Sequence, residues 1–177
     1  MNLVETSVQG AFVVQPELQG DERGFFGRLF CASAFEAHGL NSQIVQVNQS
    51  LSTQKGTLRG LHYQVAPHEE TKMVRCVRGA IWDVVLDLRQ ESPTFMQWAA
   101  HELTEENRLM MYVPQGCAHG FISLSNQAEI IYFVSQFYAS DHERGIRWDD
   151  PMFRIPWPIT PTVISEKDFS HPNFGLP

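Results

Sequence analysis

Hydrophobic residues in this chain fall into short runs rich in β-branched and aromatic side chains, and turn residues separate the runs. The runs cover residues 11–14, 43–47, 73–77, 80–88, 110–113, 118–124 and 129–137. Several short strands at such spacing are typical of a β-sandwich or a β-barrel. The pattern therefore predicts a mainly β fold.

Residues 80–88 form the longest nearly apolar run, which is interrupted by Asp83 and Asp87. Such continuous hydrophobicity predicts a strand that is buried on both faces. The two carboxylates need polar partners there, because burying an unpaired charge is costly.

Helix is predicted at two places, both short. Ser33 and Glu36 have the spacing of a capping box at the start of a helix of about two turns. Residues 103–108 predict a second short helix with Thr104 as its N-cap. From Asp150 onward prolines are too dense for a central strand, so we expect an extended C-terminal tail on the surface.

The chain has 177 residues, which predicts a single domain spanning residues 1–177. Hydrophobic residues make up 43% and charged residues 19%, a composition that excludes a disordered chain. No apolar run approaches the roughly 20 residues of a membrane span, and the first residues lack the features of a signal peptide. We therefore expect a cytoplasmic protein without a membrane partner.

The formal net charge is −7, from 20 acidic and 13 basic residues. An acidic chain without a stripe of Lys and Arg is not expected to bind nucleic acid, although a few cations in a cavity could still bind a small anion. Cys31, Cys76 and Cys117 have no CxxC spacing. This sparse set predicts reduced thiols, and neither a disulfide scaffold nor a zinc knuckle.

Residues 46–64 are rich in polar groups, yet they lie between strand-like runs. In a strand, Gly60, His62 and Gln64 would share one face, and Arg59 would lie on the other unless a bulge at Gly60 turned it. Two interpretations of His62 remain open. It is either an imidazole inside a barrel beside cations or a structural histidine held by hydrogen bonds.

Residues 114–121 contain a Pro-x-Gly-x-x-His pattern that ends at His119. The pattern resembles the second signature of the cupin barrels, in which this histidine faces the interior. Many cupins bind a metal through His-x-His, a Glu and this later His. Here the first motif reads His62-Tyr63-Gln64, so one ligand is replaced and no metal is expected.

Over nearly its whole length the chain resembles the nucleotide-sugar epimerases of the dTDP-4-dehydrorhamnose 3,5-epimerase family. The Arg-Gly-Leu-His sequence at residues 59–62 is the most specific of the shared motifs. The others lie at residues 21–26, 46–48, 72, 79–89, 92–94, 114–121, 132, 143, 148–151, 155–158 and 165–168. The resemblance implies a cupin-type jelly-roll barrel or sandwich with short helices and an extended tail.

The family resemblance also implies a reaction. A base removes the hydrogens at C3 and C5 of a nucleoside diphosphate 4-keto-6-deoxyhexose, and an acid reprotonates the resulting enolate on the opposite face. By default dTDP-4-dehydro-6-deoxy-D-glucose becomes dTDP-4-dehydro-L-rhamnose. This chemistry makes the protein an isomerase that needs no cofactor.

His62 matches the general base of the family, and a neutral imidazole suits that role near neutral pH. Asp168 matches the carboxylate that pairs with this base and stabilises the imidazolium. Asp83 is a second candidate for the same carboxylate, unless backbone donors satisfy it within its strand.

Tyr132 matches the general acid of the family, and Tyr138 is the competing candidate. Lys72 matches the cation beside the enolate. A fixed ammonium in a dry cavity stabilises an enolate by several kcal/mol more than water does.

The resemblance implies a further set of substrate-binding positions. Arginine suits a diphosphate because its planar fork binds two phosphate oxygens at once. The implied set is Arg23, Phe26, Arg28, Gln46, Asn48, Arg59, Lys72, His119, Glu143 and Lys167.

Arg28 departs from the family, which usually has Glu at this position to help bind thymine. A guanidinium has donors only, so it cannot accept a hydrogen bond from the N3–H of thymine. Thymine remains the default nucleobase, with CDP- or GDP-linked sugars as alternatives.

Family members are typically homodimers in which a segment of one subunit completes the site of the other. Arg23, Phe26 and Arg28 would then serve the partner's pocket. Three other functions remain open: an epimerase that inverts C3 alone, a metal-dependent cupin oxygenase or isomerase, and a non-catalytic cupin that binds sugar nucleotides.

Overall fold

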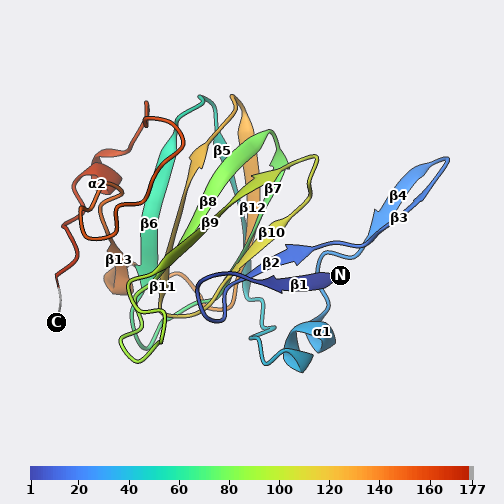
Figure 1. The fold of residues 1–177 in the computed structure, drawn as a ribbon, viewed down its shortest axis with the longest axis horizontal. Coiled ribbons are helices and arrows are strands. Elements are labelled where there is room, and N and C mark those ends of the chain that lie inside the picture. The colour runs from blue at the N-terminus through green and yellow to red at the C-terminus, as the bar shows by residue number, and fades with distance from the viewer. Residues whose placement is uncertain (176–177) are drawn as a thin grey trace.

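Two antiparallel sheets face each other across a hydrophobic core (Figure 1). The computed structural model describes residues 1–175. The six-stranded sheet has the order β1 (Asn2–Glu5), β2 (Phe12–Gln15), β10 (Met110–Val113), β7 (Lys72–Arg78), β12 (Ala128–Val134) and β5 (Gln46–Ser52). The five-stranded sheet has the order β13 (Glu143–Gly145), β6 (Leu58–Gln64), β11 (Cys117–Ser123), β8 (Ala80–Asp87) and β9 (Trp98–Thr104). The predicted mainly β fold is confirmed.

Strand β8 shows why its sequence is apolar on both sides. Ile81 and Val85 point into the core between the sheets. Val84 and Leu86 point outward and pack against Phe153 of the C-terminal tail. The prediction of a strand buried on both faces is therefore confirmed, and burial of each such side chain contributes about 1.5–3 kcal/mol.

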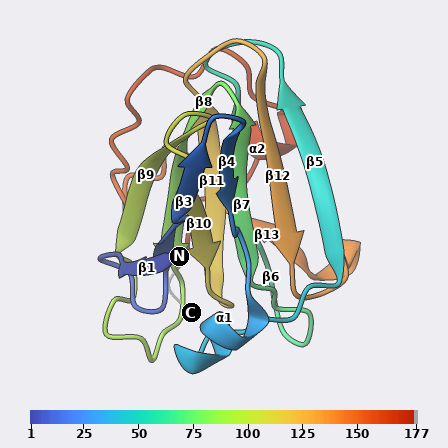
Figure 2. The same cartoon turned by 90° about the vertical axis from the view of Figure 1, so that its right-hand side faces the viewer.

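Helix α1 (Ala32–Ala37) lies at the lower end of the molecule in Figure 2 and packs against the outer face of the six-stranded sheet. Its buried Phe35 packs with Phe12, Met73 and Tyr112 of three strands. The predicted capping box is wrong, because Cys31 occupies the N-cap position and no side chain caps the helix. Glu36 instead accepts a hydrogen bond from the hydroxyl of Ser42.

The predicted helix at residues 103–108 is also wrong. Residues 105–107 form a turn after β9, and the Thr104 hydroxyl accepts a hydrogen bond from the Asn107 backbone. The Asn107 carboxamide in turn accepts from the backbone of Thr104 and of Leu109. The capping chemistry that the sequence suggested therefore closes a turn between two strands.

The predicted strand at residues 43–47 begins later, at Gln46, and continues to Ser52. Pairing with β12 decides these bounds, because each residue of β5 lies opposite one residue of β12. The tail is extended as predicted, except for the 3-10 helix η1 (Ser140–His142) before it and helix α2 (Glu166–Phe169) within it. The three cysteines are free thiols.

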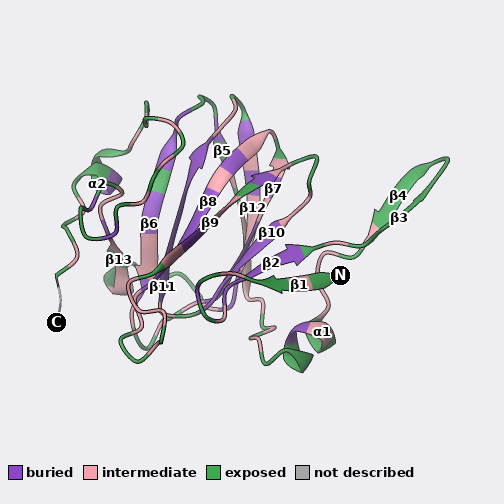
Figure 3. Ribbon diagram, in the orientation of Figure 1, coloured by how far each residue is buried: buried purple, intermediate pink, exposed green. Residues whose placement is uncertain are grey.

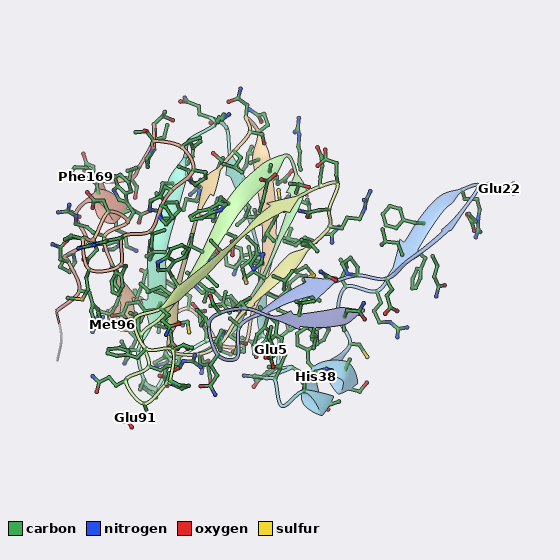
Figure 4. The ribbon with its side chains drawn as sticks, in the orientation of Figure 1. Glu5, Glu22, His38, Glu91, Met96 and Phe169 are labelled. Carbon is green, nitrogen blue, oxygen red and sulfur yellow. The ribbon has the colours of Figure 1, made fainter. Side chains whose placement is uncertain are left out.

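Strands β3 (Leu18–Asp21) and β4 (Gly24–Gly27) form an arm that projects from the sandwich (Figure 1). Almost all of its residues are exposed, as Figure 3 shows, and Glu22 lies at its tip in Figure 4. Phe26 keeps 63% of its surface exposed. Within residues 1–175, no helix is long and apolar enough to cross a bilayer.

Candidate active site

A bulge in β6 brings two polar side chains to the same side of the strand. His62 lies opposite His119 of β11, but Arg59 lies opposite Phe121, so β6 contains one extra residue. Gly60 permits the bulge, with φ +111° and no room for a side chain. The conditional prediction of a bulge at Gly60 is confirmed.

A cavity of about 290 Å³ opens between the two sheets, and a second of about 380 Å³ adjoins it. His62, Lys72 and Tyr132 line both cavities, so these side chains stand at their junction. They come from β6, β7 and β12. Arg59, His119 and Asp168 also line the first cavity, and Gln46, Asn48 and Glu143 also line the second.

His62 and Asp168 form a hydrogen-bonded pair, with 2.7 Å between Nε2 and Oδ1. Asp168 is held in place because its other oxygen accepts from the Gly60 backbone and its own backbone N–H donates to Ser165, the N-cap of α2. Burial opposes the charged form, but the hydrogen bond and charge of His62 hold the pKa of Asp168 below its usual value. Since Nε2 faces Asp168, Nδ1 is the ring nitrogen that remains for a substrate.

Asp83 pairs with the other histidine of the cavity, 2.8 Å from Nε2 of His119. It is completely buried, and this burial raises the pKa of Asp83 although His119 acts in the opposite direction. The alternatives considered for Asp83, a partner of His62 or a residue satisfied by the backbone, are both wrong. His62 and His119 therefore have separate carboxylate partners.

Lys72 makes an ion pair with Glu70, with 3.1 Å between Nζ and Oε1. Both side chains are largely buried at the junction of the cavities. Sequence reasoning missed Glu70, which lies just before β7 and lines the second cavity. The acidic residue two positions before Lys72 was the available signal.

Two tyrosines compete for one role, and their surroundings differ. Tyr132 is half-buried, and burial together with the Glu70 carboxylate raises its pKa. Tyr138 keeps 61% of its surface exposed and donates its hydroxyl proton to Glu143. Lys167 also pairs with Glu143 and lines a separate hollow outside the two cavities.

The side chain of Gln64 makes its hydrogen bonds with backbone groups. Its amide nitrogen donates to the carbonyls of His68 and Phe137, and its amide oxygen accepts from Ala139. These hydrogen bonds fasten neighbouring loops to β6, and Gln64 also lines the second cavity.

The three predicted binding residues of the arm lie away from the cavities of their own chain. Arg23 pairs with Asp21 at the exposed turn. Phe26 and Arg28 line another hollow together with Met1 and Cys31. A single chain does not bring these residues to His62.

His171 was missed by sequence reasoning, because it follows the proline-rich tail without a motif. Its Nε2 lies 3.6 Å from Oδ1 of Asp168, and its ring meets that of His62 edge-on with centroids 5.6 Å apart. Asp168 thus faces two imidazoles.

The fold and cavity define a cupin-type β-sandwich with a histidine–carboxylate pair, a lysine and a tyrosine arranged for acid–base chemistry. A family model described as dTDP-4-dehydrorhamnose 3,5-epimerase matches residues 5–175. The chain belongs to this family of isomerases.

Relatives agree with that assignment over nearly the whole chain. The dTDP-4-dehydrorhamnose 3,5-epimerase of Shigella flexneri is 43% identical, over 98% of this chain and 96% of its own. The Bacillus anthracis enzyme, solved with TDP and PPi bound, has a TM-score of 0.93 and 40% identity over 98% of this chain and 99% of its own. The Legionella pneumophila enzyme, solved with dTDP-4-keto-L-rhamnose, has a TM-score of 0.87 and 39% identity over 94% and 89%.

A relative with a narrower activity has the same fold. ChmJ, a 3'-monoepimerase from Streptomyces bikiniensis solved with dTDP-quinovose, has a TM-score of 0.86. It is 35% identical, over 94% of this chain and 85% of its own. The fold alone therefore does not distinguish inversion at one carbon from inversion at two.

Proposed function

We propose that the protein, acting through its single domain of residues 1–177, epimerises C3 and C5 of dTDP-4-dehydro-6-deoxy-D-glucose to give dTDP-4-dehydro-L-rhamnose. One observation carries the proposal. A base, an acid and a cation converge at the junction of two cavities, and the family assignment supplies a substrate that needs all three.

His62 acts as the base. The C4 ketone acidifies the adjacent hydrogens, and Nδ1 takes one of them while the electron pair moves to the carbonyl oxygen. The imidazolium that forms is stabilised by Asp168, which already accepts from Nε2. Proton transfer to a positioned imidazole contributes about 10²–10⁴-fold in rate.

Tyr132 acts as the acid. It projects from β12 of the six-stranded sheet, whereas His62 projects from β6 of the five-stranded sheet. A sugar ring held between the sheets thus has the base on one face and the acid on the other. The raised pKa of Tyr132 keeps its proton in place until the enolate needs it.

Lys72 holds the enolate oxygen. Its ammonium is largely buried and fixed by Glu70, so it needs no reorganisation when negative charge develops. His119, oriented by Asp83, binds the sugar from the same wall as His62.

The nucleoside diphosphate extends from the cavity toward the solvent. Arg59 binds the diphosphate, while Gln46 and Asn48 contact the sugar or the nucleoside. Glu143 and Lys167 border the outer end of this path.

The protein works as a homodimer in this proposal. The arm exposes Phe25, Phe26 and Leu18, and exposed apolar surface of this kind marks an interface. Placed over the partner's cavity, the arm would supply Arg23 to the diphosphate and Phe26 and Arg28 to the nucleobase. Thymine is the proposed base, and Arg28 would donate to one of its carbonyl oxygens.

Proton NMR in D₂O with dTDP-4-dehydro-6-deoxy-D-glucose tests the proposal. Deuterium entering at both C3 and C5 at catalytic rates is the expected result. Deuterium at C3 alone would replace the proposal with a 3-epimerase, as ChmJ is described.

Exchange that occurs only with CDP- or GDP-linked 4-keto sugars would overturn the choice of thymine and implicate Arg28. Binding of the nucleotide without exchange in any of these sugars would leave a non-catalytic sugar-nucleotide-binding cupin.

A further inference from the structure

We propose that His62, Asp168 and His171 form a Zn²⁺ site that switches the epimerase off when it is filled. Metal binding stands on the geometry of these three side chains. The inhibition rests on the proposed function, because it requires His62 to be the base.

The ligand atoms already lie close together. Nε2 of His62 is 2.7 Å and Nε2 of His171 is 3.6 Å from Oδ1 of Asp168. All three ligand atoms lie within 4.8 Å of one another. Around tetrahedral zinc, with bonds of about 2.0–2.1 Å, ligand atoms stand about 3.3 Å apart, so small side-chain rotations would complete the site.

His171 points to a ligand that the protein itself does not supply. Its Nε2 is buried and has no hydrogen-bond partner in the described part of the chain. The ring is held against Gly145, where any side chain would collide with it. A buried nitrogen without a partner costs about 1–3 kcal/mol, and a metal ion would remove that cost.

The surroundings suit an open zinc site. The Gly60 backbone N–H donates to Oδ2 of Asp168 and so orients the carboxylate, while Oδ1 faces both histidines, between which a metal would bind. The cavity lined by His62 and Asp168 provides space for a water as fourth ligand. Two imidazoles and one carboxylate plus water are a common set for zinc.

Zinc on Nε2 of His62 would disable the base by changing its tautomer. The metal occupies the nitrogen that otherwise faces Asp168, so the ring proton must sit on Nδ1. An N–H at that position cannot accept the hydrogen of the substrate. Filling the site therefore removes the base, and the expected inhibition appears as a loss of kcat.

A binding experiment on the purified full chain tests the site without relying on activity. Titration with Zn²⁺, and with Co²⁺ as a spectroscopic substitute, should show one site whose Co²⁺ complex has the visible bands of tetrahedral coordination. His171→Gln should weaken binding at least ~100-fold, because one of three protein ligands is lost.

His68→Gln is the matched control. His68 also has a buried ring nitrogen without a partner, but it stacks on His142 and lies outside the cluster. This variant should bind zinc like the wild type. Unchanged zinc affinity in His171→Gln, or weakened affinity in His68→Gln, would overturn the proposal.

Kinetics then connect the site to the reaction. Filling the site should lower kcat at least ~100-fold, EDTA should restore it, and His171→Gln should be insensitive to the same Zn²⁺ concentration. Full activity with zinc bound would refute the inhibition. A different outcome is that zinc binds as expected but the zinc-free protein shows no deuterium exchange. That outcome would refute the proposed function, and the metal site would still be supported.

Anomalous scattering from wild-type crystals soaked in Zn²⁺ gives a reading that does not depend on the variants. Density bridging His62, Asp168 and His171 is expected. Zinc bound at other residues with this cluster unoccupied would overturn the proposal even if His171→Gln fails to fold.

Discussion

His62 and Tyr132 are attached to opposite walls of the sandwich, so their contributions to the reaction can be separated. In the proposed mechanism, His62 alone can remove and return a hydrogen on one face of the sugar. Inversion needs the acid on the other face as well. The distinction between exchange and inversion is therefore a property of single residues.

Tyr132→Phe should uncouple exchange from inversion. The base still removes hydrogens and returns deuterium to the same face, while formation of the inverted sugar falls at least ~100-fold. NMR in D₂O measures both quantities in one sample. Tyr138→Phe, which changes the exposed competitor, should retain inversion, and the reverse outcome for the two variants would assign the acid to Tyr138.

Asp168→Asn should lower kcat by about 10²–10⁴-fold, because an amide cannot stabilise the imidazolium of His62. His62→Ala and Lys72→Ala should each lose at least ~100-fold. Asp149→Asn is the control, since Asp149 is an exposed residue paired with Arg147. Wild-type turnover in Asp168→Asn would remove the dyad from the mechanism.

Asp87 should govern stability in acid. Its buried carboxylate accepts hydrogen bonds from Arg89, Ser92 and Thr94, which outweigh the opposing effect of burial and lower its pKa from 3.8 to about 2. A lowered folded-state pKa means that the stabilisation is full above pH 3.8 and is lost as pH falls through about 2.

Between about pH 4 and pH 2, the wild type should lose about 2 kcal/mol of unfolding free energy through protonation of Asp87, and Asp87→Asn should not show this loss. It should also cost about 3 kcal/mol at neutral pH, because Arg89 loses its partner. Urea unfolding at a series of pH values measures both. Parallel curves for wild type and Asp87→Asn would contradict the assignment, and the exposed Asp141→Asn should follow the wild type.

At the scale of elements, the bulge in β6 and the short helix α2 together create the dyad. The bulge turns His62 and Arg59 into one cavity, and α2 delivers Asp168 to the same strand. The exposed Phe169 shows that α2 packs little hydrophobic surface, whereas the bulge also buries Leu61 in the core. Their value lies in where they place polar atoms.

Gly60→Ala should disrupt both stability and activity. An added Cβ would stand 2.7 Å from the Gly120 Cα and from the His119 carbonyl oxygen, at a φ of +111°. We expect a loss of at least ~2 kcal/mol in unfolding free energy and a fall in kcat, because the strand must shift. Gly39→Ala is the control, with φ +70° and nothing within 4 Å of the added Cβ, and it should cost about 1 kcal/mol. Equal costs for the two variants would show that close packing at Gly60 is not the reason for the glycine.

The sequence predicted elements best where local pattern and tertiary pairing agree. The run at residues 110–113 matches β10 to the residue, because this central strand is apolar throughout. The arm and β9 were not predicted, because hydrophobic and polar residues alternate only weakly in them. Their strand structure depends on pairing with a neighbouring strand. Thr104 shows the opposite case, in which a correct local hydrogen bond belongs to a turn instead of a helix.

The candidate site was predicted chiefly through family motifs, and the limits of that reasoning are physical. The partner of Asp83 depends on the register between β8 and β11, which places Asp83 opposite Phe121 and beside His119. His171 carries no local signal, because its neighbours His62 and Gly145 are brought to it by the path of the tail. Such contacts between distant segments cannot be read from periodicity.

At the scale of the whole molecule, the arm is the feature that a single sandwich does not explain. It holds Arg23, Phe26 and Arg28 away from the cavities of its own chain. If two chains exchange arms, each active site contains residues of both.

Mixed dimers test this exchange. The double variant Arg23→Ala, Phe26→Ala and the single variant His62→Ala should each be nearly inactive alone. After unfolding and refolding together in equal amounts, half of the dimers are mixed and each has one intact site, so about a quarter of wild-type activity should return. No recovery, despite mixed dimers detected by native mass spectrometry, would place the arm elsewhere than in the partner's site.

The order of the chain has a consequence for the protein's own synthesis. The strands of both sheets lie between Asn2 and Gly145, whereas the carboxylate that serves His62 lies at residue 168, in α2. A ribosome therefore completes every strand of the described sandwich before it adds Asp168, the proposed partner of the base. A premature stop codon between these points would leave all of those strands encoded and remove the His62–Asp168 pair on which the proposed mechanism depends.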